Sequence, residues 1–111
     1  MKRLFIISLL FLSVGLSQQL IPQITETYNN GNIKSITYHK TTRDKTEKVK
    51  SVTYYKNGQK SREQKGTFKD GYLSGLWTDW YENGQKESEG TYKDGEVISS
   101  KEWNEDGSVK E

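Results

Sequence analysis

The side chains able to carry out acid–base, nucleophilic or metal chemistry are few in this chain. It contains one histidine, His39, and no cysteine, so thiolate metal sites and disulfides are excluded. No Gly-x-Ser-x-Gly elbow occurs, and a serine–histidine–aspartate triad would have to recruit His39. The sequence therefore predicts no catalytic residue, no cofactor and no metal site.

Two groups of carboxylates come closest to a reactive site. Glu87 and Glu89 would share one face of a strand, about 6.5–7 Å apart, which suits glycoside hydrolysis only where a cleft raises one pKa. The run Asn104-Glu105-Asp106-Gly107 lacks the alternating acidic ladder of a calcium loop and is better explained as a turn. We therefore expect a protein that is not an enzyme.

Asn-Gly and Asp-Gly dipeptides recur along the chain and indicate how it folds. A two-residue hairpin turn needs positive φ at both central residues, which Asn or Asp followed by Gly tolerates best. Segments rich in aromatic and β-branched residues, such as 51–55 and 76–81, lie between these dipeptides. The pattern predicts antiparallel hairpins with structural turns at Asn30-Gly31, Asn57-Gly58, Asp70-Gly71, Asn83-Gly84, Asp94-Gly95 and Asp106-Gly107.

These turn motifs belong to an internal repeat. Tyr55 to Lys60 reappears as Tyr81 to Lys86 at an offset of 26 residues, and Gly66 to Gly71 reappears as Gly90 to Gly95 at an offset of 24. The two extra residues of the first block, within 61–65, predict a bulge or a longer turn. We expect repeats at about 27–53, 54–79 and 80–102, with a partial repeat at 103–111.

Side-chain alternation predicts an all-β fold in a single layer. Along 76–81, Trp80 would lie on one face of a strand, and Trp77 and Tyr81 on the other. Rings on both faces fit tandem antiparallel β-hairpins in an elongated single-layer meander sheet, whose stability accumulates repeat by repeat. Because rings dominate interface energetics, we take Tyr55, Trp77 and Tyr81 as the candidate partner surface; the alternative, which the sequence favours, is that these rings are structural.

The motifs Tyr-x-Asn-Gly-Gln-Lys, Gly-Thr-Tyr-Lys-Asp-Gly and Gly-Leu-Trp-x-x-Trp-Tyr together resemble the bacterial MORN-repeat variant, a class that includes the YwqK-like antitoxin family. The resemblance is close over 54–95 and loose over 27–111, and it implies a sheet of MORN-like β-hairpin repeats. Two departures stand out: the Gly75-Leu76-Trp77 signature has no counterpart near 98–100, and 43–46 replaces the Asp-Gly turn in the first repeat. We interpret the terminal repeats as caps.

The N-terminal segment has the layout of a secretory signal peptide. Lys2 and Arg3 precede an apolar stretch, and Gly15 and Ser17 occupy the −3 and −1 positions for cleavage near Ser17/Gln18. The alternative is an uncleaved membrane anchor, but a spanning helix needs roughly 20 residues and the apolar segment 4–16 has 13. We expect a signal helix at 1–17, a linker or ragged first strand at 18–26, and a periplasmic or secreted product that is not an integral membrane protein after cleavage.

Charge is distributed unevenly along the mature chain. Residues 34–69 hold eleven basic and three acidic side chains, whereas 70–111 hold four basic and eleven acidic ones. These charges can be solvated strand positions that keep sheet edges apart, an anionic-partner surface at 45–69, or the two ends of a head-to-tail self-association. Nucleic acid is not expected as a partner, because the mature net charge is zero, with 15 basic and 15 acidic residues.

Two hypotheses of function follow. The first is an exported binding or scaffold module whose partner is another protein or an envelope-surface component. The alternative, which the resemblance alone implies, is an antitoxin-like inhibitor that neutralises a partner toxin by binding it.

Overall fold

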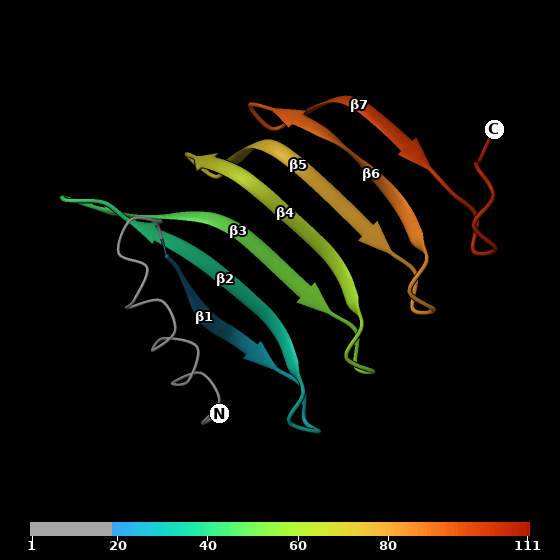
Figure 1. Cartoon of the computed structure of the whole chain (residues 1–111), viewed down its shortest axis with the longest axis horizontal. Helices are drawn as coiled ribbons and strands as arrows, with labels where there is room; N and C mark the ends of the chain where they lie inside the picture. The colour runs from blue at the N-terminus through green and yellow to red at the C-terminus, as the bar shows by residue number, and fades with distance from the viewer. Residues whose placement is uncertain (1–18) are drawn as a thin grey trace.

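The protein forms one open antiparallel sheet of seven strands (Figure 1), in a computed structural model that describes residues 19–111. The strands follow the order of the sequence, so every connection is a hairpin, and their bounds are β1 Leu20–Thr27, β2 Ile33–Thr41, β3 Thr46–Tyr54, β4 Lys60–Lys69, β5 Tyr72–Trp80, β6 Lys86–Lys93 and β7 Glu96–Glu102. The predicted all-β meander of tandem hairpins is confirmed for this part of the chain. The expected signal helix and its cleavage site lie outside the described residues.

Residues 20–26, for which we expected a linker or a ragged first strand, belong to β1. Leu20 pairs with Lys40 and Ile24 pairs with Ile36, so the segment adds to the β2 edge of the sheet. Aliphatic residues favour this strand, and Pro22 is tolerated because an edge strand has one side without a ladder. The linker assignment is thus corrected for these residues. Within 19–111, no helix is long and apolar enough to span a bilayer.

The six Asx-Gly turns fall into two geometries. Asp70 and Asp94 have φ of 52° and 50° and are each followed by a glycine with positive φ, which is the expected two-residue turn. The other four do not follow that expectation: in the turn at Asn57, only Gly58 has positive φ (93°). There the Gly58 amide donates to the Tyr55 carbonyl at 3.0 Å, and the Tyr55 amide donates to the Gln59 carbonyl at 2.8 Å. This is a three-residue loop that ends in a left-handed glycine.

The two turn geometries lie at opposite ends of the strands. Because the chain reverses at every turn, the three-residue turns that begin at Tyr28, Tyr55, Tyr81 and Asn104 all lie along one end of the sheet, as Figure 1 shows. We call these four loops (Tyr28–Asn32, Tyr55–Gln59, Tyr81–Gln85 and Asn104–Ser108) the turn row. The Asp70 and Asp94 turns lie at the opposite end.

The two extra residues of the first repeat block lengthen a strand. β4 has ten residues and pairs with β5 without a register shift, whereas β6 has eight. Both hairpins carry the same register shift beside the three-residue turn, at Thr53/Tyr54 and at Asp79/Trp80. A bulge does occur within 61–65, where Ser61 is left without a partner, but the second hairpin has the equivalent bulge at Glu87. The bulge therefore does not account for the two extra residues, which lengthen β4 instead.

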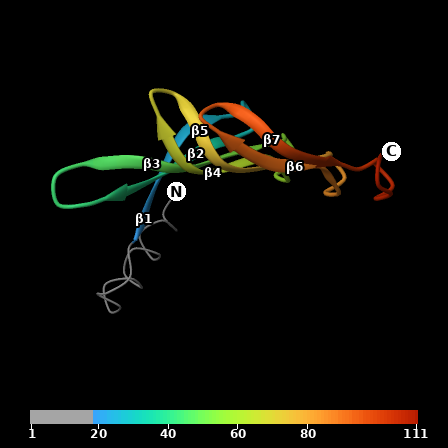
Figure 2. The same ribbon diagram turned by 90° about the horizontal axis from the view of Figure 1, so that it is seen from above.

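The sheet has two distinct faces and a thin core. Figure 2 shows a twisted single layer, in which Val52 is 1% exposed while β1 and β7 are exposed along their whole length. Directly paired residues share a face, so one face carries Gln64, Trp77 and Gly90; we call it the Trp77 face. The opposite face carries the paired residues Lys50, Lys65, Leu76 and Thr91; we call it the lysine face.

Candidate binding surface

The tyrosines that open the turn row connect each repeat to the next. The hydroxyl groups of Tyr28, Tyr55 and Tyr81 donate to the backbone carbonyls of Tyr54 (2.6 Å), Trp80 (2.6 Å) and Trp103 (2.8 Å). Each acceptor immediately precedes the next loop of the row. The tyrosine rings are half-buried, so these bonds are made where few water molecules can replace them.

Asparagine side chains add a second set of contacts between neighbouring loops. The Nδ2 atoms of Asn32, Asn57 and Asn83 donate to backbone carbonyls of the following loop, at Lys56 (2.8 Å), Glu82 (3.3 Å) and Glu105 (3.2 Å). Together with the tyrosine hydroxyls, they hold the loops in a fixed row. The local dipeptides therefore set both the turn and its attachment to the next repeat.

Trp77 is held inside the Trp77 face. Its side chain is 9% exposed and meets the Tyr92 ring edge-on, with ring centres 4.9 Å apart and planes inclined by 77°. The Trp77 ring lies over Gly90, where a Cβ atom would collide with it and with the Ser99 carbonyl oxygen. The glycine is needed here because the ring occupies the space that any side chain would take.

All three rings of the candidate partner surface thus make internal contacts. The structure does not bring them together: Tyr55 and Tyr81 lie in successive loops of the turn row, whereas Trp77 lies within β5. Sequence alternation could not assign these roles, because they depend on which carbonyl or glycine the register places opposite each ring. The rings that sequence reasoning passed over, Trp80 and Trp103, lie on the lysine face.

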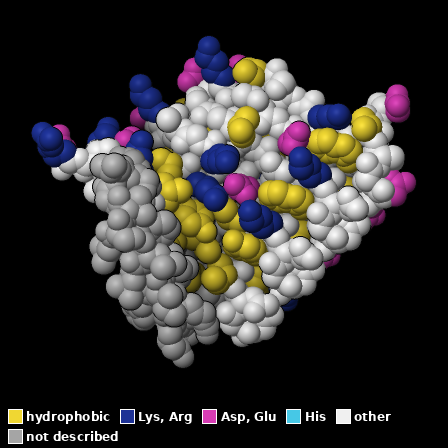
Figure 3. Space-filling model, in the orientation of Figure 1, with side chains coloured by type: hydrophobic (Ala, Val, Ile, Leu, Met, Phe, Trp, Pro, Cys, Tyr) yellow, Lys and Arg dark blue, Asp and Glu magenta, His cyan; other side chains and the backbone are white. Residues whose placement is uncertain are grey.

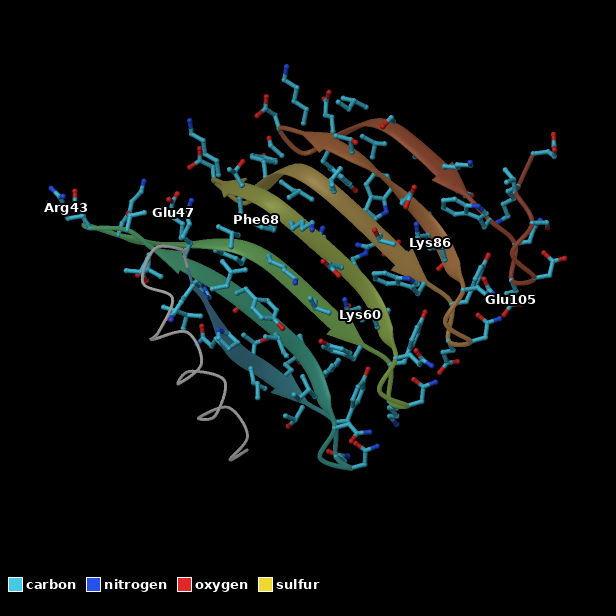
Figure 4. The ribbon with its side chains drawn as sticks, viewed as in Figure 1. Arg43, Glu47, Lys60, Phe68, Lys86 and Glu105 are labelled. Carbon is cyan, nitrogen blue, oxygen red and sulfur yellow. The ribbon has the colours of Figure 1, made fainter. Side chains whose placement is uncertain are left out.

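Rings and lysines alternate across the lysine face beside the turn row. Tyr54 pairs with Lys60, and Trp80 pairs with Lys86. The Lys60 ammonium lies 5.6 Å from the centre of the Trp80 ring, and the Lys86 ammonium lies 5.5 Å from that of Trp103. Lys60 and Lys86 are labelled in Figure 4 and come from β4 and β6. We call these rings and lysines the ring–lysine row. The contact between a lysine and a tryptophan ring recurs every second strand, as expected for a repeat of one hairpin.

Two glutamates anchor the lysines of this row. Lys60 donates to Glu63 at 2.9 Å, and Lys86 donates to Glu89 at 2.8 Å. Burial acts to raise the pKa of Glu63, but the Lys60 hydrogen bond and the charges of Lys60, Lys50 and Lys65 outweigh it, so this pKa lies below its ordinary value. Glu63 is therefore ionised at neutral pH and holds the lysines against the rings.

An open groove on the lysine face crosses β5, β6 and β7. Its lining includes Leu76, Glu89, Thr91, Ser99 and Lys101. Leu76 is 52% exposed, and two further apolar side chains at this end of the sheet, Tyr72 and Ile98, are 60% and 61% exposed. Figure 3 shows hydrophobic and basic side chains interspersed over the sheet. The groove therefore offers apolar surface flanked by one acidic side chain, Glu89, and one basic side chain, Lys101.

Several lysines around the groove form no close ion pair, although Lys93 is paired with Glu96 and Lys101 with Glu89 across neighbouring strands. Lys60 and Lys86 are engaged in ion pairs, but no carboxylate of residues 19–111 comes within 4.0 Å of the ammonium groups of Lys65, Lys69, Lys93 and Lys101. Register places Lys65 beside Leu76 and Lys69 beside Tyr72. We call Tyr72, Leu76 and these four lysines the cationic patch.

The residues considered for chemistry are dispersed over the sheet. His39 lies within β2, paired with Ile21 and Lys48, Glu89 is engaged by Lys86, and Glu87 stands at a register shift of β6. Over the part of the chain that the structure describes, no three His, Cys, Asp or Glu side chains are grouped so as to hold a metal ion.

Comparison with known proteins identifies one repeat. Residues 73–94 match the family model for the MORN repeat variant. This window runs from β5 through the Asn83-Gly84 turn to the Asp94 turn, so it includes Trp77, Trp80, Tyr81 and Gly90. No curated protein and no solved structure matches the chain.

Proposed function

We propose that this chain is an exported, non-catalytic repeat protein that acts as a binding or scaffold module in the periplasm or outside the cell. Its partner would be an acidic protein or another anionic envelope component that docks on the cationic patch. The repeats of 27–111 would all be of the MORN-variant type. Export rests on the sequence of residues 1–17.

The observation that carries this proposal is the cationic patch itself. An open sheet has no enclosed volume in which to surround a reaction, but it presents a broad face. On that face, exposed Leu76 and Tyr72 adjoin Lys65 and Lys69, whose ammonium groups have no carboxylate of the described chain within 4.0 Å. A partner with acidic and apolar groups would gain charge complementarity at the rim and apolar burial in the groove.

A capture experiment with matched variants tests the binding module. Immobilised wild type and the double variant Lys65→Glu, Lys93→Glu would be incubated with envelope extract, and retained components measured by quantitative mass spectrometry and lipid and glycan analysis. Lys56→Glu is the matched control, because Lys56 is an exposed lysine of the turn row. We expect the control to retain the wild-type partners and the double variant to lose them; equal retention by all three proteins would contradict the proposed surface.

The antitoxin-like alternative predicts a different outcome of the same experiment. A neutralising inhibitor would retain one protein in equal molar amount, and that protein would arrest growth when produced alone.

The export claim has a separate test, because the N-terminus of the mature protein should lie near Gln18. Mass spectrometry that finds intact Met1 in the natural product would contradict export without affecting the binding surface.

A further inference from the structure

We propose that Asn30 is a site of spontaneous deamidation in the folded protein, whereas Asn57 and Asn83, in the same Asn-Gly sequence, are protected by the repeat that follows them. In this reaction the glycine amide nitrogen loses its proton to a base and bonds to the asparagine Cγ. The Cγ–Nδ2 bond breaks, and the nitrogen leaves as ammonia after taking a proton from water. Water then opens the succinimide ring to aspartate or isoaspartate.

Two constraints are common to the three turns and do not distinguish them. The glycine amides of Gly31, Gly58 and Gly84 donate to the carbonyl of the tyrosine three residues earlier, at 2.9, 3.0 and 2.9 Å. The Oδ1 atom of each asparagine accepts from the amide two residues later, at 2.9 Å in every turn. All three asparagines are exposed, so water and base can reach each of them.

Among the contacts within residues 19–111, the nitrogen that must leave is held in two of the three turns. The Nδ2 atoms of Asn57 and Asn83 donate to the carbonyls of Glu82 and Glu105 in the next loop. In the first turn, the corresponding contact to the Lys56 carbonyl is made by Asn32. Turning the amide toward the glycine nitrogen therefore breaks a contact between repeats at Asn57 and Asn83, but breaks none of this kind at Asn30.

The fourth turn shows how the product fits. Asp106 stands where the other turns have asparagine, its Oδ1 accepts from the Ser108 amide at 2.9 Å, and the Gly107 amide donates to the Asn104 carbonyl at 2.9 Å. The loop thus tolerates aspartate where it makes no forward contact. At Asn83, a carboxylate oxygen would face the Glu105 carbonyl oxygen, which repels it.

Peptide mapping of the purified full-length protein tests the site. The folded protein would be incubated at mildly alkaline pH, and deamidation at each asparagine followed by mass spectrometry, with a urea-unfolded sample as the reference. We expect Asn30 to react about two- to tenfold faster than Asn57 or Asn83 in the folded protein, the factor that one net hydrogen bond supplies. In urea the three rates should converge. Folded-state rates at Asn57 or Asn83 that equal or exceed the rate at Asn30 would overturn the proposal.

The consequence of deamidation has its own measurement. Asn30→Asp should melt at the wild-type temperature, while Asn83→Asp should melt at a lower one, because only the second variant loses a contact between loops. Equal melting of the two variants would overturn the assigned difference between the turns. Neither result depends on the partner proposed above.

Discussion

The tyrosine hydroxyl groups of the turn row each connect one repeat to the next through a single hydrogen bond. Each donates to a carbonyl more than twenty residues away in the sequence, as Tyr55 does to Trp80 at 2.6 Å. Each of these carbonyls belongs to the residue that immediately precedes the next loop. The rings therefore matter for their polar end as well as for their apolar area.

Removing the Tyr55 hydroxyl should weaken the fold measurably. We expect Tyr55→Phe to lower the free energy of unfolding by about 1 kcal/mol, because one half-buried hydrogen bond is lost and its carbonyl is left poorly solvated. Chemical denaturation monitored by circular dichroism measures the change. Tyr72→Phe is the matched control, since Tyr72 is 60% exposed. A Tyr55→Phe variant as stable as this control would mean that the hydroxyl bond adds nothing.

Glu63 should make stability depend on pH. Its pKa in the folded protein is lowered, because the attraction of the neighbouring lysines exceeds the opposing effect of burial. Its contribution is therefore complete above the unfolded-state pKa of about 4.3 and is lost as the pH falls through the folded-state pKa.

The Glu63→Gln variant isolates this contribution. At neutral pH it should be less stable than wild type by up to about 1 kcal/mol, the range of partly exposed ion pairs. The difference in the free energy of unfolding should shrink as the pH falls through the folded-state pKa of Glu63. Denaturation midpoints across the acidic range measure it. Glu96→Gln, at an exposed position of β7, serves as the control; a Glu63→Gln difference that stays constant with pH would contradict the ion-pair explanation.

At the scale of elements, the sequence predicted where the chain turns better than how it turns. All six Asx-Gly positions are turns, yet only Asp70 and Asp94 adopt the two-residue form. The dipeptide is compatible with both geometries, and the choice depends on how far the flanking strands stay paired. Strand pairing extends to Lys69 and Tyr72 around Asp70-Gly71, but stops at Tyr54 and Lys60 around Asn57-Gly58. Register depends on how two strands pair, so the sequence of one strand alone does not determine it.

Candidate surface residues were predictable only as a class. The sequence indicated that rings and lysines would cover the sheet, and they do. It could not separate Trp77, which is enclosed by Tyr92 and Gly90, from Leu76, which is exposed beside it. The difference arises from what the neighbouring strand places opposite each side chain, and a glycine opposite Trp77 was the one available signal.

Filling the space at Gly90 should disrupt the packing of β5 against β6. A methyl group there would collide with the Trp77 ring and the Ser99 carbonyl oxygen, so Gly90→Ala should cost about 1–3 kcal/mol of stability. Near-ultraviolet circular dichroism and thermal melting would report the displaced ring and the lost stability. Ser88→Ala, on the same strand and face, is the control. If Gly90→Ala melts like this control, the ring does not lie over the glycine as described.

At the scale of the whole molecule, the contacts between repeats have a direction. Tyr28, Tyr55 and Tyr81 each reach forward to the next loop, but Asn104 stands at the corresponding position of the fourth loop and donates within its own loop, to Ser108 at 3.0 Å. A head-to-tail contact through this end of the sheet would lack the tyrosine hydroxyl that joins the internal repeats. The opposite charges of the two halves would then be the main attraction in such an assembly, and salt would weaken it.

The distribution of buried side chains and of strand ladders predicts a gradient of local stability from the middle of the sheet to its two edges. The buried apolar side chains of residues 19–111, Ile36, Val52, Leu73 and Trp77, lie on β2, β3 and β5, whereas β1 and β7 are exposed throughout. Opening an outer strand breaks one ladder, while opening an inner strand breaks two. We therefore expect hydrogen exchange to be slowest in β3 to β5 and fastest in β1 and β7.

The variant Tyr81→Phe tests whether the loss of one contact between repeats affects only the strands beside it. Because the Tyr81 hydroxyl holds the Trp103 carbonyl at the end of β7, its removal should speed hydrogen exchange in β6 and β7 and leave β2 and β3 unchanged. Exchange measured by mass spectrometry on peptides from each hairpin separates these regions. A uniform acceleration across all seven strands would show that the sheet opens as one cooperative unit, against the repeat-by-repeat stability inferred from its contacts.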